Sequence, residues 1–346
     1  MSGGLDSSVA AYLMREAGHE VVGVFFRLWD PLAGHASRCC SLEDLEDARR
    51  VAQELGIPLR EECSTRRFFD EVFEASLERY VEGLTPNPCV VCNARVKFPE
   101  LVRVAEEEGA EFMVTGHYAR LEHGPGGPRL HRGAVREKDQ SYFLHRLGRD
   151  LLERLRFPVG GMGKEEVRDL ALASGLSVAS KRESQELCFV PPGTSCADLV
   201  ERWKGDSIRP GPIVDREGRV LGEHRGVHRF TIGQRRGIGV SAEAPLYVLA
   251  TRREDAAVVV GPREALETWR IGVRDIVWVR GAPPAGRFAC TVQVRSRHGG
   301  TPAVVDVEGS GATVTVEEPL RGPAPGQAAV FYDGDEVLGG GWIVGG

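Results

Sequence analysis

The opening residues of the chain form a loop whose composition suits phosphate binding. Residues 2–8 read SGGLDSS and lead directly into a predicted helix. Two adjacent glycines let backbone amides approach an anion closely, and the start of a helix adds a partial positive charge. Serine hydroxyls can donate hydrogen bonds, and Asp6 could hold Mg²⁺ against the phosphates. The loop contains no lysine, so it differs from the phosphate loop of ordinary kinases and ATPases. The alternative is a serine-capped helix after a glycine turn.

A set of cysteines is the second candidate for chemistry. Cys89 and Cys92 form a C-x-x-C motif in the run TPNPCVVCN at 85–93, and Cys188 follows in the run SQELCF at 184–189. One interpretation is a reactive pair, Cys92 and Cys188, that carries and resolves sulfur. Such a pair needs a thiolate with a lowered pKa.

Two other interpretations of the cysteines stay open. A structural zinc site could join Cys89 and Cys92 to Cys39 and Cys40, although adjacent cysteines chelate one ion poorly and the chain has no second C-x-x-C. The simplest expectation for an isolated cysteine is an inert, buried thiol. This expectation applies to Cys63, Cys196 and Cys290.

The composition is typical of a globular protein with a sizeable core. The chain has 346 residues, of which 42% are hydrophobic and 27% charged, and this length suggests two or three domains. No window approaches about 18 uncharged apolar residues, which excludes a membrane span, and no secretion signal is recognisable. Eight cysteines are too sparse for a disulfide scaffold. We therefore expect a cytoplasmic protein.

Charge is distributed unevenly along the chain. The formal net charge is −6, but residues 40–112 hold 17 acidic and 9 basic residues, whereas residues 270–300 hold six arginines and one aspartate. Residues 219–236 hold five arginines and one glutamate. Solvated surface is the simplest explanation of any single arginine. The asymmetry as a whole is compatible with nucleic-acid contact through the C-terminal half.

Apolar periodicity indicates which elements carry these motifs. The pattern predicts helices at 7–16, 42–55, 68–82 and 98–108, and strands at 20–28 and 111–115. Strands that alternate with helices at this spacing favour a parallel sheet covered on both faces. Residues 194–250 are basic and rich in turns. Residues 253–346 alternate β-branched residues with glycines in several short runs, which is typical of a small antiparallel barrel.

Eight blocks in a fixed order make the chain similar to a known family. SGGxDS is the signature of the PP-loop ATP pyrophosphatases, which cut ATP between its α and β phosphates, and the whole chain resembles the tRNA-specific 2-thiouridylases within that superfamily. The blocks are SGGLDSSV (2–9), CCSLEDLEDARRVAQELGIP (39–58), TPNPCVVCN with RVKF (85–98), TGHYAR (115–120), KDQSYFL (138–144), SQELCF (184–189), TIGQRRGIG (231–239) and PGQAAVFYDGDEVLGGG (325–341).

The resemblance implies an α/β fold in three parts. It implies a parallel-sheet PP-loop domain of the adenine nucleotide α-hydrolase type at 1–190, a small α+β domain that contacts tRNA at 194–250, and a C-terminal antiparallel β-barrel at 253–346. A PP-loop normally follows a buried strand, and here it follows Met1 directly. Loss of that strand would uncover the edges of its neighbours. We therefore expect that the first strand is missing because the start of the gene was assigned too late, which puts ATP binding by this chain in doubt.

The resemblance also implies an activity. Members of the family use ATP to activate the C2 oxygen of the wobble uridine (position 34) of tRNA, release pyrophosphate, and replace the AMP-bearing oxygen with sulfur to give 2-thiouridine. ATP with Mg²⁺ is the implied cofactor, with no prosthetic group and no metal held by the protein alone. The implied ATP-binding residues are Met1, Ser2, Gly3, Gly4, Leu5, Asp6, Ser7, Phe26 and Gly116.

By the same resemblance, Cys188 carries the persulfide, and Cys92 is the nucleophile that resolves it by forming a disulfide with Cys188. Asn87, Pro88 and Cys89 lie on the loop that meets the target base, and we expect a pocket between the domains to receive that base once it leaves the anticodon stack. The implied tRNA contacts are His117, Lys138, Asp139, Gln140, Arg295, Ser296 and Gln327, with added backbone affinity from Arg229, Arg235 and Arg236.

The implied partners are tRNAs for Lys, Glu and Gln and a sulfur donor, either a cysteine desulfurase or a sulfur-relay protein. Three alternatives remain. A tRNA 2-thiocytidine synthetase is expected to show paired C-x-x-C motifs, which this chain lacks. An amide-forming ligase that uses an adenylate has no need of Cys92 and Cys188. A non-catalytic tRNA-binding protein has no reason to retain the loop and both cysteines.

Overall fold

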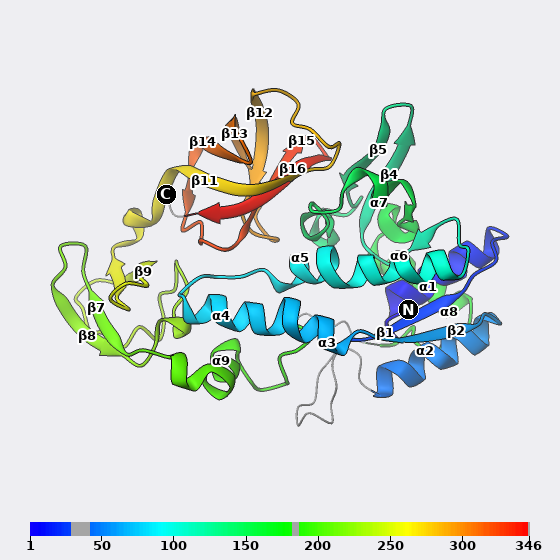
Figure 1. The fold of residues 1–346 in the computed structure, drawn as a ribbon, viewed down its shortest axis with the longest axis horizontal. Helices are drawn as coiled ribbons and strands as arrows, with labels where there is room; N and C mark the ends of the chain where they lie inside the picture. The colour runs from blue at the N-terminus through cyan, green and yellow to red at the C-terminus, as the bar shows by residue number, and fades with distance from the viewer. Residues whose placement is uncertain (29–41, 182–186, 345–346) are drawn as a thin grey trace.

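The chain folds into three successive parts that meet around the middle of the molecule (Figure 1). The computed structural model describes residues 1–28, 42–181 and 187–344. An α/β part comes first, a small four-stranded sheet follows, and a closed antiparallel barrel ends the chain. The fold class expected from the sequence is confirmed.

The α/β part is mainly helical. Its helices are α1 (Leu5–Glu16), α2 (Leu42–Leu55), α3 (Thr65–Phe68), α4 (Ala75–Val81), α5 (Pro88–Cys92), α6 (Phe98–Glu107), α7 (Arg149–Glu153) and α8 (Lys164–Ala173). Its strands are β1 (Gly23–Arg27), β2 (Leu59–Cys63), β3 (Met113–Val114), β4 (Ala119–Gly124), β5 (Gly127–Arg132) and β6 (Leu155–Arg156). The helix predicted at 42–55 is confirmed at both ends, whereas the strands predicted at 20–28 and 111–115 are shorter than expected.

Two of the predicted helices contain π-turn segments that the sequence did not reveal. One segment, Phe69–Glu74, joins α3 to α4, and the other, Asn93–Lys97, joins α5 to α6. The helix predicted to begin at residue 98 therefore begins at Pro88 and carries both cysteines of the C-x-x-C motif in its first turns. Such segments occur often at functional sites, and this one begins immediately after Cys92.

The parallel strands form two separate pairs. Strand β1 pairs with β2, with Phe25 opposite Glu61, and β3 pairs with β6, with Met113 opposite Leu155. Within the described residues no ladder of hydrogen bonds joins the two pairs. Helix α1 packs between α2 and α8, and its residues Val9 and Ala10 are fully buried in the cluster that these helices form. This packing fixes the start of α1 and with it the glycine–serine loop.

The C-terminal part is a barrel that closes on itself. Its strands are β11 (Glu267–Trp278), β12 (Arg287–Gln293), β13 (Thr301–Glu308), β14 (Gly311–Arg321), β15 (Ala328–Asp333) and β16 (Glu336–Val344). They pair in the order β11-β14-β13-β12-β15-β16, and β16 pairs again with β11. The β4–β5 hairpin, which the sequence analysis missed, joins the edge of β16 through a single pairing of His131 with Glu336.

The central part is a small sheet with one helix. Its strands β7 (Gly211–Val214), β8 (Val220–His224), β9 (Tyr247–Thr251) and β10 (Val258–Gly261) pair in the order β8-β7-β10-β9, and helix α9 (Cys196–Lys204) packs against α4. Both neighbouring parts hold the turn after α4. The Thr251 hydroxyl donates to the carbonyl oxygen of Gly83 at 2.8 Å, and the Thr85 amide donates to that of Pro325 at 2.9 Å. The segment that leads to the C-x-x-C motif is thus fixed from two sides.

Candidate active site

The glycine–serine loop has a backbone that only glycine can supply at its centre. Gly3 has a φ of +67°, and a Cβ atom there would overlap the carbonyl oxygen of Asp44. Gly4 is the N-cap of α1, and the side chain of Leu5 is buried below the loop. The backbone of Gly116 lies directly against the loop, since a Cβ atom there would come within 2.6 Å of the Ser7 nitrogen. Gly116, which the resemblance places at the nucleotide, therefore lies beside this loop, and its role in binding ATP stays a prediction.

The hydroxyls and the N-terminus keep the loop compact. Ser7 Oγ accepts from the Ser2 amide at 3.0 Å and lies 3.1 Å from Ser2 Oγ. The hydroxyls of Ser7 and Ser8 donate to the carbonyl oxygen of Gly4 at 3.1 and 2.9 Å. The amino group of Met1 donates to the carbonyl oxygen of Val24 on β1. The first N–H groups of α1 have no acceptor within the helix, so they are the backbone donors that this loop offers to an anion.

Two lysines that the sequence analysis missed reach this loop from later segments. Lys164, the first residue of α8, donates to Asp6 Oδ1 at 2.7 Å, and the Tyr118 hydroxyl donates to the same oxygen at 2.6 Å. Lys181 Nζ donates to the carbonyl oxygen of Gly3 at 2.9 Å. The loop contains no lysine of its own, and neither lysine belongs to a local motif, so only the fold reveals them.

Lys181 also binds two carboxylates at the start of α2. Its ammonium lies 2.7 Å from Asp44 Oδ1 and 2.6 Å from Asp47 Oδ2. Burial lowers the pKa of Lys181, but the hydrogen bonds that its ammonium donates to Asp44 and Asp47 outweigh burial, and the net pKa is raised. The charge is therefore permanent at neutral pH, and it ties the loop to α2.

The loop offers a place for a magnesium ion as well. Asp6 accepts both of these hydrogen bonds through Oδ1, and within the described residues Oδ2 accepts none. A carboxylate oxygen beside bound phosphates is the usual protein ligand of Mg²⁺. The described residues contain no group of three side chains that could hold a metal without a substrate, so the arrangement suits an ion shared with ATP.

Cys92 and Cys188 lie in one apolar cluster. Cys92, on the last turn of α5, is 4% exposed, and Cys188 is half-buried against the same cluster. Phe26, at the end of β1, packs there too. Both sulfurs are thiols, as are those of the other described cysteines. The structure therefore brings together the two predicted catalytic cysteines and the predicted adenine-side residue.

Aromatic packing holds the turn that carries Cys188. Phe189 is fully buried, and its ring meets those of Phe68 and Phe73 edge-on at centroid distances of 6.2 and 5.4 Å. The Val190 amide closes the turn onto the carbonyl oxygen of Leu187 at 3.0 Å. Each such aromatic pair contributes about 0.5–1.5 kcal/mol beyond its buried area. The packing of Phe189 therefore restrains the turn that contains Cys188.

The other thiols are placed as follows. Cys89 is exposed, although its neighbours Pro88 and Val90 are buried. Cys39 and Cys40, which the zinc alternative required, lie outside the described residues. Cys196 packs against the catalytic cluster, where burial raises its pKa, and Cys290 packs in the barrel, where burial raises its pKa to about 12. Cys63, expected to be buried and inert, is exposed, so that expectation is wrong for this residue because it ends the short edge strand β2.

The predicted target-base loop is held by the barrel. Asn87 caps α5 by accepting from the Val90 amide at 3.4 Å. Gln327 Nε2 donates to the carbonyl oxygen of Pro86 at 3.3 Å, and the Tyr142 hydroxyl lies 3.4 Å from Gln327 Oε1. Gln327, predicted to contact tRNA, thus lies beside the loop that is predicted to meet the base.

The predicted tRNA contacts within TGHY and KDQ have internal partners. His117 Nδ1 lies 2.7 Å from Thr115 Oγ1, and its half-buried ring stacks on that of Phe98 at 5.8 Å. Burial, with the charge of Lys97, holds the pKa of His117 well below its ordinary value, so the ring is neutral at physiological pH. The Tyr118 amide donates to Gln140 Oε1 at 3.0 Å.

Asp139 has a structural position that the sequence did not suggest. Its carboxylate is buried 2.9 Å from Arg132 Nη1, and it accepts from the amides of Gly133 and Ser141, both at 3.0 Å. Arg132 in turn lies over the ring of Tyr332 on β15. Lys138, one residue earlier, is half-exposed. Asp139 therefore fixes the turn that presents Lys138.

Some basic residues of the C-terminal half already have partners within the protein, whereas others are exposed and could bind an anionic partner. Arg295 donates to the carbonyl oxygen of Arg321 at 3.0 Å, and the carbonyl oxygen of Ser296 accepts from Gln293 at 3.0 Å. Arg229 is paired with Glu201. Arg235 and Arg236 are exposed, and no ion pair holds them in the part of the chain that the structure describes. Arg225 of the same run is likewise exposed and has no ion pair among the described residues, so these three arginines remain available to an anionic partner.

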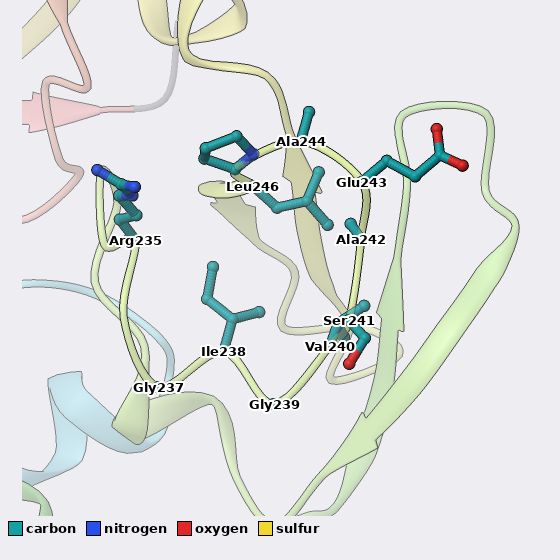
Figure 2. A pocket seen from close by; sticks show the side chains of 11 residues that line it. Arg235, Gly237, Ile238, Gly239, Val240, Ser241, Ala242, Glu243, Ala244 and Leu246 are labelled. Carbon is teal, nitrogen blue, oxygen red and sulfur yellow. The ribbon is translucent and has the colours of Figure 1, made fainter.

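A cavity of about 530 Å³ lies beside Arg235 in the central part (Figure 2). Arg235 and residues 237–246 line it, with Arg235 on one side and Glu243 at the opposite rim, and Ile238 and Leu246 between them. None of the loop or cysteine residues described above lines this cavity. It is separate from the candidate active site.

Comparison with known families agrees with these features. A glycine–serine loop at the start of α1, with two lysines beside it, defines an α/β nucleotide-binding domain. Residues 1–192 match the model of the tRNA methyl transferase HUP domain, residues 198–262 the tRNA methyl transferase PRC-barrel domain, and residues 269–343 the aminomethyltransferase beta-barrel domain.

Similar proteins narrow the class. Those named tRNA-specific 2-thiouridylase MnmA are 47% identical in Rhodospirillum centenum, 47% in Geobacter metallireducens and 48% in Chloroflexus aurantiacus. Each alignment spans 99% of this chain, and it covers 90%, 95% and 96% of the respective relative. The chain belongs to the tRNA-specific 2-thiouridylase family. The solved U34-tRNA thiolase NcsA from Methanococcus maripaludis matches 59% of this chain and 63% of its own at 18% identity, but its TM-score of 0.36 is too low to bear on fold or function.

None of the helices in the described ranges is long and apolar enough to cross a membrane.

Proposed function

We propose that this protein is an ATP-dependent sulfurtransferase that converts the wobble uridine of tRNA to 2-thiouridine, with AMP and pyrophosphate as the other products. One observation carries the proposal. Cys92 and Cys188, far apart in the sequence, pack in a single apolar cluster together with Phe26. Delivery of a sulfane sulfur leaves a two-electron oxidised product, so it requires a second thiol in the same region of the fold, which this cluster supplies.

The glycine–serine loop is the proposed site for ATP. The amides at the start of α1 and the hydroxyls of Ser2 and Ser7 would bind the phosphates, and Phe26 and Gly116 would border the nucleotide. Lys164 and Lys181 would offset negative charge of the phosphates, because the loop itself contains no lysine. Mg²⁺, held through Asp6, would neutralise further phosphate charge when bound.

The proposed reaction has two stages. The C2 oxygen of the uridine first attacks the α-phosphate of ATP and displaces pyrophosphate, since a carbonyl oxygen leaves only after it carries a phosphate. The terminal sulfur of a persulfide on Cys188 then attacks C2, or is released as sulfide to do so, and AMP leaves with the former oxygen. The Cys92 thiolate attacks Cys188 Sγ and breaks its bond to the terminal sulfur. That sulfur leaves as the 2-thio group of the uridine or, in the second route, as the sulfide that then attacks C2, so the two residues end as a disulfide.

The RNA is proposed to bind across all three parts. We delimit them at 1–190, 194–262 and 263–346, because β10 (Val258–Gly261) pairs within the central sheet and so extends the central part beyond the residue 250 expected from the sequence. Asn87, Pro88 and Cys89 would meet the target base. The proposed tRNA contacts are His117, Lys138, Asp139, Gln140, Arg295, Ser296 and Gln327, with Asp139 acting by holding the turn. We propose tRNAs for Lys, Glu and Gln as targets, a cysteine desulfurase or sulfur-relay protein as the donor, and the cytoplasm, where these partners occur, as the location.

A single assay tests the function. Wobble-uridine tRNA is incubated with the protein, Mg·ATP and a persulfide source, and the digested nucleosides are identified by mass spectrometry. Wild type and the control variant Cys63→Ser should form 2-thiouridine, whereas Cys92→Ser and Cys188→Ser should form none. Product from Cys188→Ser at the wild-type rate would refute the assignment of the persulfide to this residue. No product from wild type, with tRNA still bound, would favour a binding protein.

A further inference from the structure

A third thiol stands one helical turn before Cys92. Cys89 and Cys92 lie three positions apart on α5, and the helix continues through the π-turn segment into α6. Residues with this separation lie on the same side of a helix. Cys89 is exposed, Cys188 is half-buried and Cys92 is almost completely buried. The C-x-x-C motif therefore joins the surface to the catalytic cluster.

The geometry permits a bond between Cys89 and Cys92. Helical residues three positions apart have Cβ atoms about 5–6 Å apart, and those of a disulfide are about 3.5–4.5 Å apart. The remaining adjustment is small. Cys89 lies in the first turn of the helix, whose N–H groups have no partner within the helix, so the backbone there can adjust without breaking the hydrogen bonds of the interior.

We propose that Cys89 reopens the Cys92–Cys188 disulfide that each turnover forms. This proposal rests on the proposed function. The Cys89 thiolate attacks Cys92 Sγ of the Cys92–Cys188 disulfide, the bond between Cys92 and Cys188 breaks, and Cys188 leaves as a thiolate ready to receive a new persulfide. The oxidising equivalent now resides in a Cys89–Cys92 disulfide. A protein dithiol of the C-x-x-C reductase class reduces that disulfide by two electrons and is itself oxidised to a disulfide.

Burial explains why the relay is useful. Cys92 has too little exposed surface for a protein reductant to reach it, because exchange requires in-line approach of a sulfur to the bond. Exchange with Cys89 transfers the disulfide to a pair in which one sulfur, that of Cys89, is exposed. Cys196 also packs against the cluster, but burial raises its pKa and the Tyr80 hydroxyl hydrogen-bonds to its sulfur. Cys196 is therefore the weaker nucleophile and the natural comparison.

The first experiment maps disulfides after one turnover. Wild type loaded with persulfide is given tRNA and Mg·ATP without reductant, alkylated in acid, and digested for mass spectrometry. We expect the Cys89–Cys92 linkage in wild type and in Cys196→Ser, and the Cys92–Cys188 linkage in Cys89→Ser. Accumulation of Cys92–Cys188 alone in wild type would overturn the proposal.

The second experiment measures recycling. The rate of later turnovers is divided by that of the first, so any effect of the substitution on the first turnover cancels. With a protein dithiol as reductant, this ratio should fall about tenfold in Cys89→Ser and return to the wild-type value with dithiothreitol, a small thiol that reaches half-buried Cys188. An unchanged ratio would refute the relay. If wild type forms no 2-thiouridine at all, the proposed function fails. The same mapping on protein equilibrated with oxidised glutathione then decides whether Cys89–Cys92 is the favoured pair.

Discussion

Removal of the Lys181 ammonium tests how the glycine–serine loop is held. This side chain binds the Gly3 carbonyl oxygen and the carboxylates of Asp44 and Asp47, with distances of 2.6–2.9 Å. In Lys181→Met these three acceptors lose their donor, and two carboxylates one helical turn apart are left beside the loop that is proposed to bind the phosphates of ATP. We therefore expect weaker ATP binding rather than a defect in sulfur transfer.

The size of the effect follows from the exposure of Lys181. A hydrogen bond to a charged group contributes about 1.5–3 kcal/mol when buried, whereas an exposed ion pair contributes below about 1 kcal/mol. The Lys181 side chain is 27% exposed, so we assign about 2 kcal/mol to the three bonds together. Because about 1.4 kcal/mol corresponds to a tenfold change, the dissociation constant of Mg·ATP should rise by about 30-fold.

Lys204 provides the matched control. Its ammonium also bonds two carboxylates, Glu74 at 2.9 Å and Glu78 at 3.4 Å, and its side chain is 19% exposed. Titration calorimetry with Mg·ATP should give a wild-type affinity for Lys204→Met and a weakened one for Lys181→Met, while both lower the melting temperature. The raised pKa of Lys181 means that its contribution is complete below the ordinary lysine pKa and is lost only as pH rises through the higher folded value. The difference between the variants should thus be constant from pH 6 to 9. Equal affinities would refute the role of Lys181 at the loop.

Three further outcomes follow from the same contacts. Gly116→Ala places a methyl group against the backbone of Asp6 and Ser7, so equilibrium binding of Mg·ATP should be lost while circular dichroism stays native. Asp139→Ala leaves a buried Arg132 without its carboxylate, which should lower the free energy of unfolding in urea by about 3–5 kcal/mol. His117 has a lowered folded pKa, so its contribution to stability is complete above the ordinary histidine pKa and is lost as pH falls below it; in His117→Gln, melting temperatures should decline less steeply from pH 7 to 5.

Local chemistry in the sequence predicted the parts of the site that are contiguous. The glycine–serine loop, the helix at 42–55 and the barrel strands each carry their own periodicity or turn residues. The lysines could not be predicted, because Lys164 and Lys181 reach the loop only when α8 packs on α1. The structural position of Asp139 was equally hidden, because its partner Arg132 lies on a hairpin whose alternating pattern is short.

The start of the C-x-x-C helix was missed for a different reason. Pro86 and Pro88 favour an extended turn in a sequence-based interpretation, and the following valines favour a strand. In the folded chain Pro88 takes the first helical position, where a missing N–H has no cost, and Asn87 supplies the cap. A tertiary contact decides the outcome, since the barrel fixes Thr85 and Pro86 just before this helix begins.

The attachment of the barrel to the α/β part explains how a distant domain can position the cysteine segment. Asp335 and Glu336, at the β15–β16 turn, each bind two arginines, and these come from the hairpin region and from the end of β11. The pairs are Asp335 with Arg120 and Arg136, and Glu336 with Arg129 and Arg280. The two arginines bonded to Glu336 lower its pKa despite its burial, so the carboxylate stays ionised at neutral pH.

This ionic junction and the Pro325–Thr85 hydrogen bond lie in the same stretch of the barrel, residues 325–336, so a rotation of the barrel that strained one would strain the other. Each further contact between the two parts, such as the hydrogen bond from Gln327 to the Pro86 carbonyl oxygen, removes a rotation that a single contact would allow. The segment that leads to Cys89 and Cys92 is therefore held against a barrel that cannot pivot freely, and a tRNA bound across both parts would meet the cysteines in one fixed geometry.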